Sequence, residues 1–374
     1  MRRSLLVLAV LACILGVEGG QALGKAPAGK PRAHAGVSMT VFASGFNNPR
    51  GLKFGPDGNL YVAEGGLGGS HSTVGDCTQA SGAAAPYTGS THSKTLGSRI
   101  SRVTPSGHVS TVVDSLPSSQ TSAALGSLVS GISAVAFAHH NLYGLLAGAG
   151  CSHGVPGVPN GVFRVRDDGT IKMIANLSRF QRNHPVANPP VEDFEPDGTW
   201  YSMASLDGKL YPMDSNHGEL DRVTRKGHIS RVSDISAKLG HNVPTALAFR
   251  AGTWKIGNLG VFGPPDGTTL NEKVWRLNSS GSFAVRGPGL EQVVSLAFRK
   301  DKLFALELSN TPGGPTPGTG QIVRVRADGP GRVIASGLMF PTGMTVGPDG
   351  AFYVSVNGLG FGAGQGQVLR ITTG

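Results

Sequence analysis

After its first 17 residues the sequence has no long apolar run, so the rest of the chain offers no candidate for a membrane span of about 20 residues. It has no run of Lys or Arg, and only 6% of its residues are aromatic. Both shortages argue against a nucleic-acid partner, which basic patches and stacking aromatics would recognise. No Gly-x-Ser-x-Gly elbow, phosphate loop, Cys-x-x-Cys pair or dinucleotide fingerprint occurs in a supporting context. The catalytic chemistry that those motifs mark is therefore not expected.

The N-terminus resembles a secretory signal. Arg2 and Arg3 are followed by an apolar run from Ser4 to Val17 and by Ala22-Leu23-Gly24, a small-x-small cleavage site. We predict a signal peptide over residues 1–24, a flexible linker over 25–38 and a secreted or periplasmic domain over 39–374. The alternatives are a retained anchor, for which the run is short, and a lipoprotein cleaved before Cys13, although the apolar run continues through that cysteine.

Cysteine is scarce. Export would remove Cys13 and leave Cys77 and Cys151 in an oxidising compartment. Both fall in loops that leave the same end of neighbouring repeats, so we predict that they form a disulfide. Two free thiols are the alternative.

Charge and composition favour a soluble β protein. Cleavage would leave 31 basic and 22 acidic residues, which without a Lys/Arg cluster indicates a generally basic, solvated surface. The 57 glycines, 24 prolines and many short β-branched runs are typical of strands joined by tight turns.

Six copies of one short strand organise the chain. Each copy carries an arginine flanked by aliphatic residues, and successive arginines lie 62, 58, 54, 48 and 46 residues apart. This spacing is typical of four-stranded propeller blades. The arginines, which we interpret as structural, are Arg102, Arg164, Arg222, Arg276, Arg324 and Arg370.

The two ends of the chain carry matching segments, which predicts how the ring closes. Val41 to Phe46, followed by Pro49, resembles Val333 to Leu338, followed by Pro341. The later segment is the outer strand of the fifth repeat, and the sixth repeat lacks its own. We therefore predict an all-β, six-bladed β-propeller that the N-terminal strand closes by pairing in the last blade.

The repeats resemble the ScyD/ScyE family, named for scytonemin pigment biosynthesis. The likeness spans residues 39 to 374 and is clearest in Glu195-Pro196-Asp197-Gly198 and in the segment from Asp214 to Val223. Part of that segment is also similar to NHL repeats, which are common in interaction propellers. Membership would imply an exported propeller of unassigned chemistry.

Two enzyme families are similar in their repeats. The sugar dehydrogenases that use pyrroloquinoline quinone tend to carry Glu-Arg where this chain has Glu64-Gly65, and their histidine-glutamine constellation has no match. Gluconolactonase-like hydrolases bind a divalent cation at the propeller axis and use an aspartate at a strand end that Asp214 matches. Their other ligands, on the innermost strands, have no clean counterpart.

Aligning the ends of the second strands yields a candidate metal site. Four oxygen-bearing side chains occupy equivalent ends, a set that suits a hard divalent cation such as Ca²⁺. They are Glu64, Asp214, Asn258 and Glu307. The alternative for Asp214 is turn capping through backbone N–H groups.

Two functions follow from these patterns. The first is a monomeric binding propeller that presents its loop-rich face to an unidentified protein or small ligand, with no catalytic residue assigned. The alternative is a divalent-metal-dependent hydrolase or lyase that acts on a small lactone or cyclic substrate. Fold alone does not choose between them.

Overall fold

The computed structural model describes residues 32–33, 36–81, 86–121, 128–261, 273–311 and 314–373. The predicted signal peptide and most of the predicted linker lie outside these residues. In the part of the chain that is described, no helix is long and apolar enough to cross a membrane.

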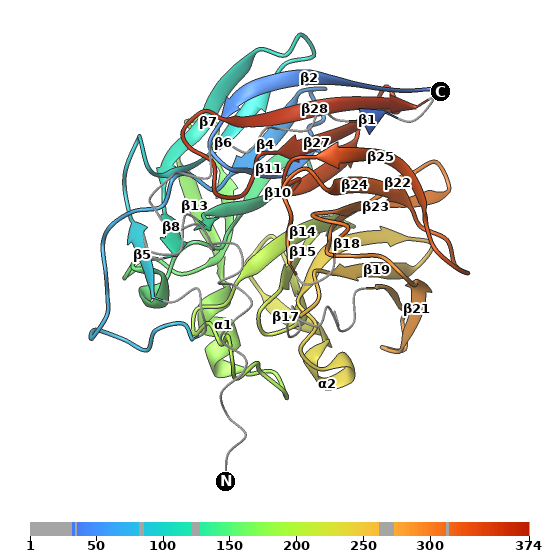
Figure 1. Ribbon diagram of the computed structural model, residues 1–374. Coiled ribbons are helices and arrows are strands. Elements are labelled where there is room, and N and C mark those ends of the chain that lie inside the picture. Colours follow the sequence, from blue (N-terminus) through green and yellow to red (C-terminus); the bar gives the residue numbers. More distant parts are fainter. Residues whose placement is uncertain are drawn as a thin grey trace, which may run out of the picture.

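The described strands form six antiparallel sheets in which four strands lie side by side (Figure 1). In chain order the first three sheets are β3 (Pro49–Phe54), β4 (Leu60–Glu64), β6 (Ser98–Val103) and β7 (Val109–Leu116); β10 (Ile132–Ala138), β11 (Asn141–Leu146), β12 (Gly161–Val165) and β13 (Ile171–Asn176); and β14 (Trp200–Leu206), β15 (Lys209–Asp214), β16 (Glu219–Val223) and β17 (Ile229–Asp234). The next two are β18 (Pro244–Arg250), β19 (Thr253–Asn258), β20 (Val274–Leu277) and β21 (Phe283–Gly287); and β22 (Val293–Arg299), β23 (Lys302–Glu307), β24 (Gly320–Arg324) and β25 (Arg332–Leu338), to which β1 (Arg32–Ala33) adds. The sixth consists of β26 (Gly343–Val346), β27 (Phe352–Val356), β28 (Gly366–Thr373) and β2 (Val37–Phe46).

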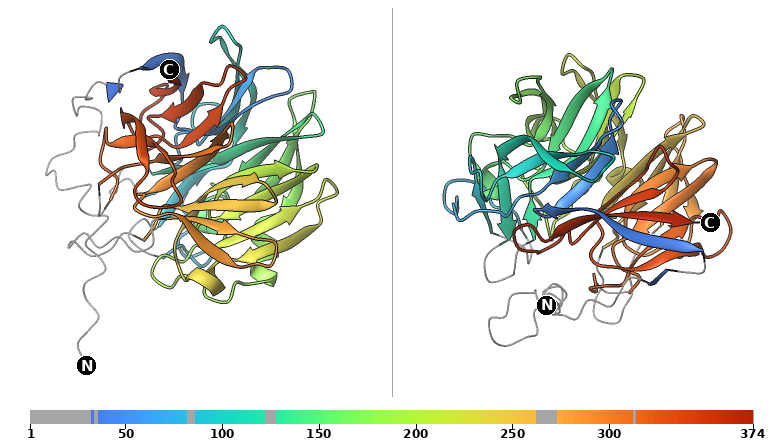
Figure 2. Two further views of the ribbon diagram at one scale, coloured as in Figure 1. Left: turned by 90° about the vertical axis from the view of Figure 1, so that its right-hand side faces the viewer. Right: turned by 90° about the horizontal axis from the view of Figure 1, so that it is seen from above.

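The innermost strands of these sheets contact one another in a ring. In order around the axis they are β3, β10, β14, β18, β22 and β26, and β26 contacts β3 again. The sheets radiate from this ring, with the outer strands β7, β13, β17 and β21 towards the outside in Figure 1, and Figure 2 shows the same sheets from two further sides. The six repeated arginines all lie on the third strands. The architecture is therefore the all-β propeller that the repeats predict, and we number its sheets as blades one to six.

The N-terminal strand closes the ring. β2 pairs antiparallel with β28, the third strand of blade six, with Met39 opposite Ile371 and Val41 opposite Leu369. Phe46, at the end of β2, is fully buried in the cluster between blades six and one, where it packs with Leu52, Leu60 and Val368. The predicted closure is thus confirmed, and it leaves no unpaired edge on β28.

Long loops rise from the end of the propeller where the innermost strands begin. The insertion of blade one carries β5 (Tyr87–Ser90), which pairs with β8 (Ser118–Thr121), and β8 pairs in turn with β9 (Val129–Ser130). A short 3₁₀ turn, Cys151–His153, follows the second strand of blade two. The helices α1 (Leu177–Asn183) and α2 (Ser236–Leu239) follow the outer strands of blades two and three.

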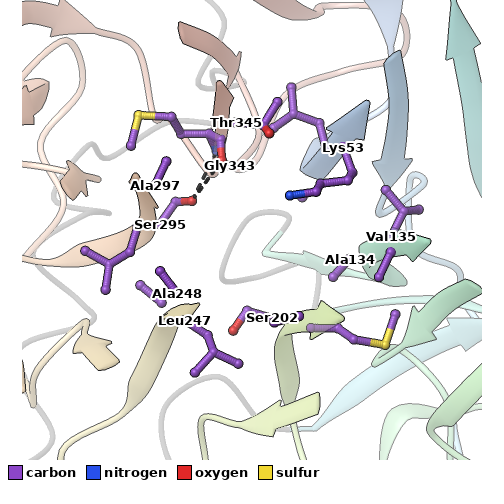
Figure 3. Close-up of a pocket in the computed structure, with 18 of the residues that line it drawn as sticks. Lys53, Ala134, Val135, Ser202, Leu247, Ala248, Ser295, Ala297, Gly343 and Thr345 are labelled. Carbon is purple, nitrogen blue, oxygen red and sulfur yellow. Dashed lines mark hydrogen bonds between the residues drawn. The ribbon is translucent and has the colours of Figure 1, made fainter. Parts of the chain in front are cut away.

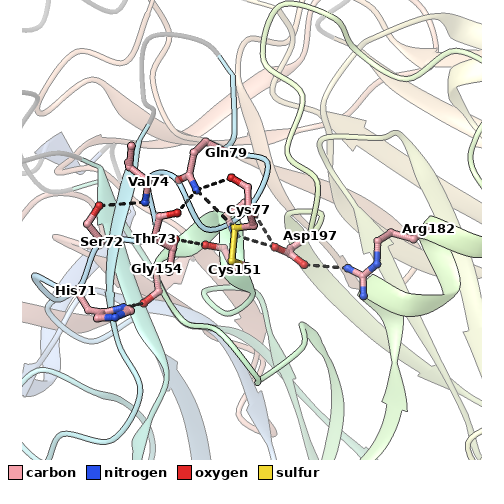
Figure 4. Close-up of a disulfide and its surroundings, with 11 residues drawn as sticks. His71, Ser72, Thr73, Val74, Cys77, Gln79, Cys151, Gly154, Arg182 and Asp197 are labelled. Carbon is pink, nitrogen blue, oxygen red and sulfur yellow. Dashed lines mark hydrogen bonds and ion pairs between the residues drawn. A yellow bond between two sulfur atoms is a disulfide. The ribbon is translucent and has the colours of Figure 1, made fainter.

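A disulfide joins two of these loops. Cys77 and Cys151 are bonded, with their Cα atoms 6.3 Å apart (Figure 4). Around the bridge, the Thr73 hydroxyl donates to the Cys151 carbonyl, and the Ser152 N–H donates to Asp197 Oδ2 over 2.9 Å. The disulfide predicted from count and topology is present, and it ties the insertion of blade one to blade two.

We predict that deleting residues 39–46 sharply lowers the melting temperature, because blade six loses its outer strand and the buried Phe46. Phe46→Ala alone should lower the free energy of unfolding by about 3–5 kcal/mol, as expected for a large buried side chain. Calorimetry measures both effects. Deleting residues 25–31 is the control and should leave the melt unchanged. An unchanged melt after the 39–46 deletion would contradict the closure.

Removing the disulfide should also destabilise the protein. The bridge spans a sequence separation of 74 residues, for which the chain-entropy relation predicts an upper figure of about 4.5 kcal/mol. Urea denaturation of the Cys77→Ser/Cys151→Ser double variant, compared with the oxidised and the reduced wild type, measures the effect. The variant and the reduced protein should unfold together, below the oxidised protein. Coincidence of all three transitions would show that the bridge does not contribute.

Candidate functional site

The four predicted ligand positions are equivalent in the structure. Each lies at the end of a second strand, opposite the first residue of the innermost strand of the same blade. The pairs are Glu64 with Pro49, Asp214 with Trp200, Asn258 with Pro244 and Glu307 with Val293. The strand alignment made from the sequence is therefore correct.

Glu64 is fully buried and bonded on several sides. Its carboxylate accepts hydrogen bonds from the Asn47 N–H over 2.6 Å, from Arg99 Nε over 2.8 Å and from the Ser101 hydroxyl over 2.5 Å. Burial raises the pKa of Glu64, although Arg99 and the other donors oppose that shift. These bonds tie the start of the first blade to its third strand.

Glu307 and Asn258 play similar local roles. The Glu291 N–H donates to Glu307 Oε1 over 3.0 Å, and Gln321 Nε2 donates to Oε2 over 2.5 Å. Burial, opposed by these two donors and reinforced by the negative charge of Glu291, raises the pKa of Glu307 to about 7. The Lys273 N–H donates to Asn258 Oδ1 over 3.1 Å.

Asp214 caps the loop that follows its strand. Its Oδ1 accepts the N–H groups of Asn216 over 2.7 Å and of His217 over 3.1 Å, and Gln181 of α1 donates to Oδ2 over 2.5 Å. Burial acts to raise the pKa of Asp214, but His217 and the other donors outweigh it and lower that pKa. Asp214 therefore caps a turn, which is the alternative that its sequence position offered.

These contacts do not fit the metal site expected from the sequence. In the described ranges, no group of three or more His, Cys, Asp or Glu side chains could hold a metal ion. The physical reason is that each carboxylate is held by donors of its own loop or neighbouring strand, which orient it locally. Calcium binding by this protein stays a prediction, and no set of such ligands is assembled among the described residues.

A cavity of about 480 Å³ lies on the axis, lined by the six innermost strands (Figure 3). Along each strand small and large residues alternate, as in Ala134-Val135-Ala136 and Ala246-Leu247-Ala248. Large residues such as Val135, Met203 and Leu296 pack into the clusters between blades. Since the intervening residues are small, the space at the axis stays open.

Lys53 interrupts this pattern. The strand registers place one residue of each innermost strand at the same level of the cavity, opposite the aromatic position of the second strand. They are Lys53, Ala136, Ala204, Ala248, Ala297 and Thr345. Among the described residues that line the cavity, Lys53 is the one charged side chain, and Figure 3 shows its ammonium group extending into the opening.

The environment of Lys53 is unusual for an ammonium group. Solvent reaches the side chain through the cavity, yet protein surrounds it, and this desolvation lowers the pKa of the amine. No acidic residue lines the described cavity wall. The amine therefore lacks a counter-charge within the cavity.

The end of the cavity nearer the long loops is crossed by a side chain. Tyr201 of blade three reaches over the axis, and its hydroxyl donates to the Thr342 carbonyl of blade six over 3.2 Å. Arg50 lies beside it and donates to the Val129 carbonyl. Burial lowers the pKa of Arg50, and the adjacent Tyr201 partly opposes this shift. Lys53 lies further along the axis, towards the opposite end.

Comparison with known proteins supports the fold. No family model matches the chain, and no curated protein matches its sequence. Similar solved structures include a proposed oxidoreductase (glucose dehydrogenase) from Thermus thermophilus, with 18% identity, TM-score 0.56 and coverage of 90% of this chain and 100% of that one. A gluconolactonase from Xanthomonas campestris has 10% identity, TM-score 0.54 and coverage of 96% and 99%, respectively. A luciferin-regenerating enzyme has 10% identity, TM-score 0.51 and coverage of 90% and 95%.

The chain has the fold of a β-propeller. Its structural neighbours include a gluconolactonase, and at such low identity the likeness extends to the fold alone. The ScyD/ScyE resemblance is neither matched nor contradicted by these comparisons and stays a prediction.

Sequence reasoning missed Lys53, although the sequence contains a signal for it. Aligning the innermost strands places Leu52-Lys53-Phe54 with Val135-Ala136-Phe137 and Leu296-Ala297-Phe298. A lysine at a position otherwise occupied by Ala or Thr stands out only after the strands are known to face one axis.

Replacing Glu307 and Asp214 by their amides should change the free energy of unfolding in opposite directions. Because the pKa of Glu307 is higher in the folded than in the unfolded chain, stability falls as the pH rises from about 4.5 to about 7. We therefore expect Glu307→Gln to be more stable than the wild type at pH 7, by on the order of 3 kcal/mol at most. The pKa of Asp214 is lowered, so its contribution is present above the unfolded value and lost as the pH falls. Asp214→Asn should be less stable at pH 7.

Urea denaturation of both variants at pH 5 and pH 7 tests this contrast. The advantage of Glu307→Gln should be smaller at pH 5 than at pH 7. Equal destabilisation by both substitutions at both pH values would show that the pKa values of the two carboxylates are not shifted in opposite directions.

Proposed function

We propose that this chain is an exported binding propeller that holds a small organic acid in its axial cavity, with Lys53 pairing with the carboxylate of that acid. The observation that carries the proposal is the single ammonium group in a layer otherwise made of alanine and threonine. A wall of small apolar and hydroxyl-bearing side chains with one uncompensated cation is complementary to a small ligand that carries one negative charge.

The dimensions and the energetics agree with this ligand class. The cavity of about 480 Å³ falls within the size range typical of small-molecule sites. A desolvated ammonium disfavours the empty state, and a bound carboxylate would offset that desolvation by a charge-assisted hydrogen bond. An acid with a compact apolar part would also contact the alanines around Lys53.

This proposal moves the small ligand away from the loop-rich face, where the sequence analysis expected it. Three histidines of that face lie against partners of their own. His153 Nδ1 bonds to Ser119 over 3.1 Å, and His217 Nδ1 lies 3.4 Å from Asp214 Oδ2. His241 Nε2 lies 3.2 Å from Asp193 Oδ2. These side chains support the loops, and the described chain offers no free cluster of them.

Export and ScyD/ScyE membership are part of the proposal. They rest on the N-terminal sequence and on the repeat motifs, and the disulfide is compatible with an oxidising compartment. The alternative is a divalent-metal-dependent hydrolase or lyase, for which the described residues offer no assembled group of three or more His, Cys, Asp or Glu ligands.

Thermal shift with a panel of small monocarboxylates and their matched primary amides tests the proposal. We expect at least one carboxylate, for example benzoate, to raise the melting temperature of the wild type, while its amide does not. Lys53→Met should weaken this binding by roughly 10- to 100-fold, the loss of one charge-assisted hydrogen bond. Lys209→Met, which removes a surface charge from blade three, is the control and should bind as the wild type. A panel without any binder, or equal binding by Lys53→Met, would overturn the proposal.

The same variant has a second readout that shows whether it folds. The lowered pKa of Lys53 means that its charge disfavours the folded state at neutral pH, and the effect fades as the pH rises through the folded pKa towards 10.5. Lys53→Met should therefore be at least as stable as the wild type at pH 7, and the difference should shrink at higher pH.

A further inference from the structure

A second cavity, of about 350 Å³, lies in blade five and is strongly basic. Its charged lining residues come from all four strands of the blade, β22 to β25, and are Arg299, Lys302, Arg324 and Arg332. Val37 of β2 and Thr373 of β28 complete the wall, so the cavity lies where blade five meets the closing strands of blade six. We call it the basic pocket.

The strand registers place the cations of the basic pocket directly opposite one another in two cross-strand pairs. Arg299 is directly opposite Lys302, and Arg324 is directly opposite Arg332. Like charges directly opposite on neighbouring strands destabilise a sheet. Two such pairs on adjacent hairpins bring four positive charges to one wall at the expense of stability.

Counter-charges are missing from this wall. No acidic residue lines the described basic pocket, and none of the ion pairs among the described residues includes its four cations. Of the neighbouring acids in the chain, Asp301 is bonded to Arg250, and Asp328, in the turn between β24 and β25, neither lines the pocket nor forms one of these ion pairs. The positive charge of the pocket is therefore left for a ligand.

One of the four cations is held in place by aromatic rings. The Arg299 guanidinium lies 5.1 Å from the ring centroid of Phe304 and 4.6 Å from that of Phe352. Stacking of this kind restricts the guanidinium plane. Desolvation in this position lowers the pKa of Arg299. The pocket is thus partly preorganised rather than a set of freely moving surface chains.

Other blades do not combine these features. The position opposite the repeated arginine is Ser110 in blade one, Ser230 in blade three and Ala284 in blade four. Blade two has the pair Arg164 and Lys172 there, but it places Ala138 opposite Asn141 where blade five has Arg299 opposite Lys302. Among the described strands, blade five alone carries both like-charge pairs, so the propeller repeat does not require them.

We propose that the basic pocket binds a multivalent oxyanion, a phosphate or sulfate group with two or more negative charges. Guanidinium groups bind such groups through paired N–H donors, and four cations without acids match a divalent or higher charge better than a single carboxylate. This site is separate from the axial cavity, and it does not depend on the ligand of Lys53.

Titration with pyrophosphate at constant ionic strength tests the proposal. Calorimetry and thermal shift should show saturable binding to the wild type. The Lys302→Gln/Arg332→Gln variant should bind at least about 10-fold more weakly, because each lost charge-assisted contact is worth about a factor of ten or more. The matched control is Lys172→Gln/Lys209→Gln, which makes the same charge change at the corresponding strand positions of blades two and three. It should bind as the wild type.

A stability readout separates loss of the ligand from loss of the fold. Without anion, the Lys302→Gln/Arg332→Gln variant should melt at or above the temperature of the wild type, since the substitutions relieve cross-strand repulsion. Equal pyrophosphate shifts in all three proteins would indicate general charge screening and would overturn the proposal, as would no shift in the wild type.

Vesicles distinguish the source of the oxyanion. Flotation with phosphatidylcholine vesicles containing phosphatidic acid, whose phosphate monoester can carry two negative charges, compared with phosphatidylcholine alone, tests a lipid headgroup. Binding that depends on Lys302 and Arg332 would identify the anion as a headgroup. Saturable pyrophosphate binding without flotation would identify it as a free phosphate or phosphate ester.

Discussion

The pairing of β2 with β28 joins the N-terminal part of the chain to the last blade of the propeller. A propeller has no covalent closure, so its first and last blades separate unless one end of the chain completes the other. Here the ten-residue strand β2 (Val37–Phe46) forms the outer strand of blade six, and Phe46 packs at the junction with blade one. The same strand contributes Val37 to the basic pocket. Closure therefore holds the ring together and also shapes one of its cavities.

Closure also fixes the level at which each innermost strand meets the axis. In the closed ring, the alternation of small and large residues along the innermost strands has two consequences. Large side chains such as Leu52 and Met344 pack between blades, and small ones leave a space of about 480 Å³. Strand-end acids such as Glu64 and Asp214 hold the loops at one end of this space through backbone and side-chain donors. A single charged residue, Lys53, remains on the described wall, and we infer the ligand from it.

Much of the fold could be predicted from the sequence because it is encoded by repetition. The repeated arginine strands and the matching segments Val41 to Phe46 and Val333 to Leu338 specify sheets and closure directly. Cys77 and Cys151 follow from count and topology. The strand-end alignment was also correct in register. Its functional interpretation was not supported, because register does not say where a side chain points, and donors such as the Asn47 and His217 N–H groups decide that locally.

The axial cavity and the basic pocket could not be predicted from the sequence, for a related reason. Lys53 becomes distinctive only when six strands are viewed around one axis. The basic pocket arises only when Arg324, part of the structural repeat, is placed opposite Arg332. Each depends on registers between strands distant in the sequence, whereas composition showed only that the chain is basic.

Binding of a carboxylate by Lys53 can be tested by measuring the pKa of its ammonium group. Nuclear magnetic resonance of the labelled lysine side chains, with Lys53→Met used to assign the signal, follows this titration without and with a saturating monocarboxylate. We expect a pKa below the ordinary value of 10.5 in the free protein and a rise when the carboxylate binds. An ordinary pKa that does not respond to any carboxylate would contradict it.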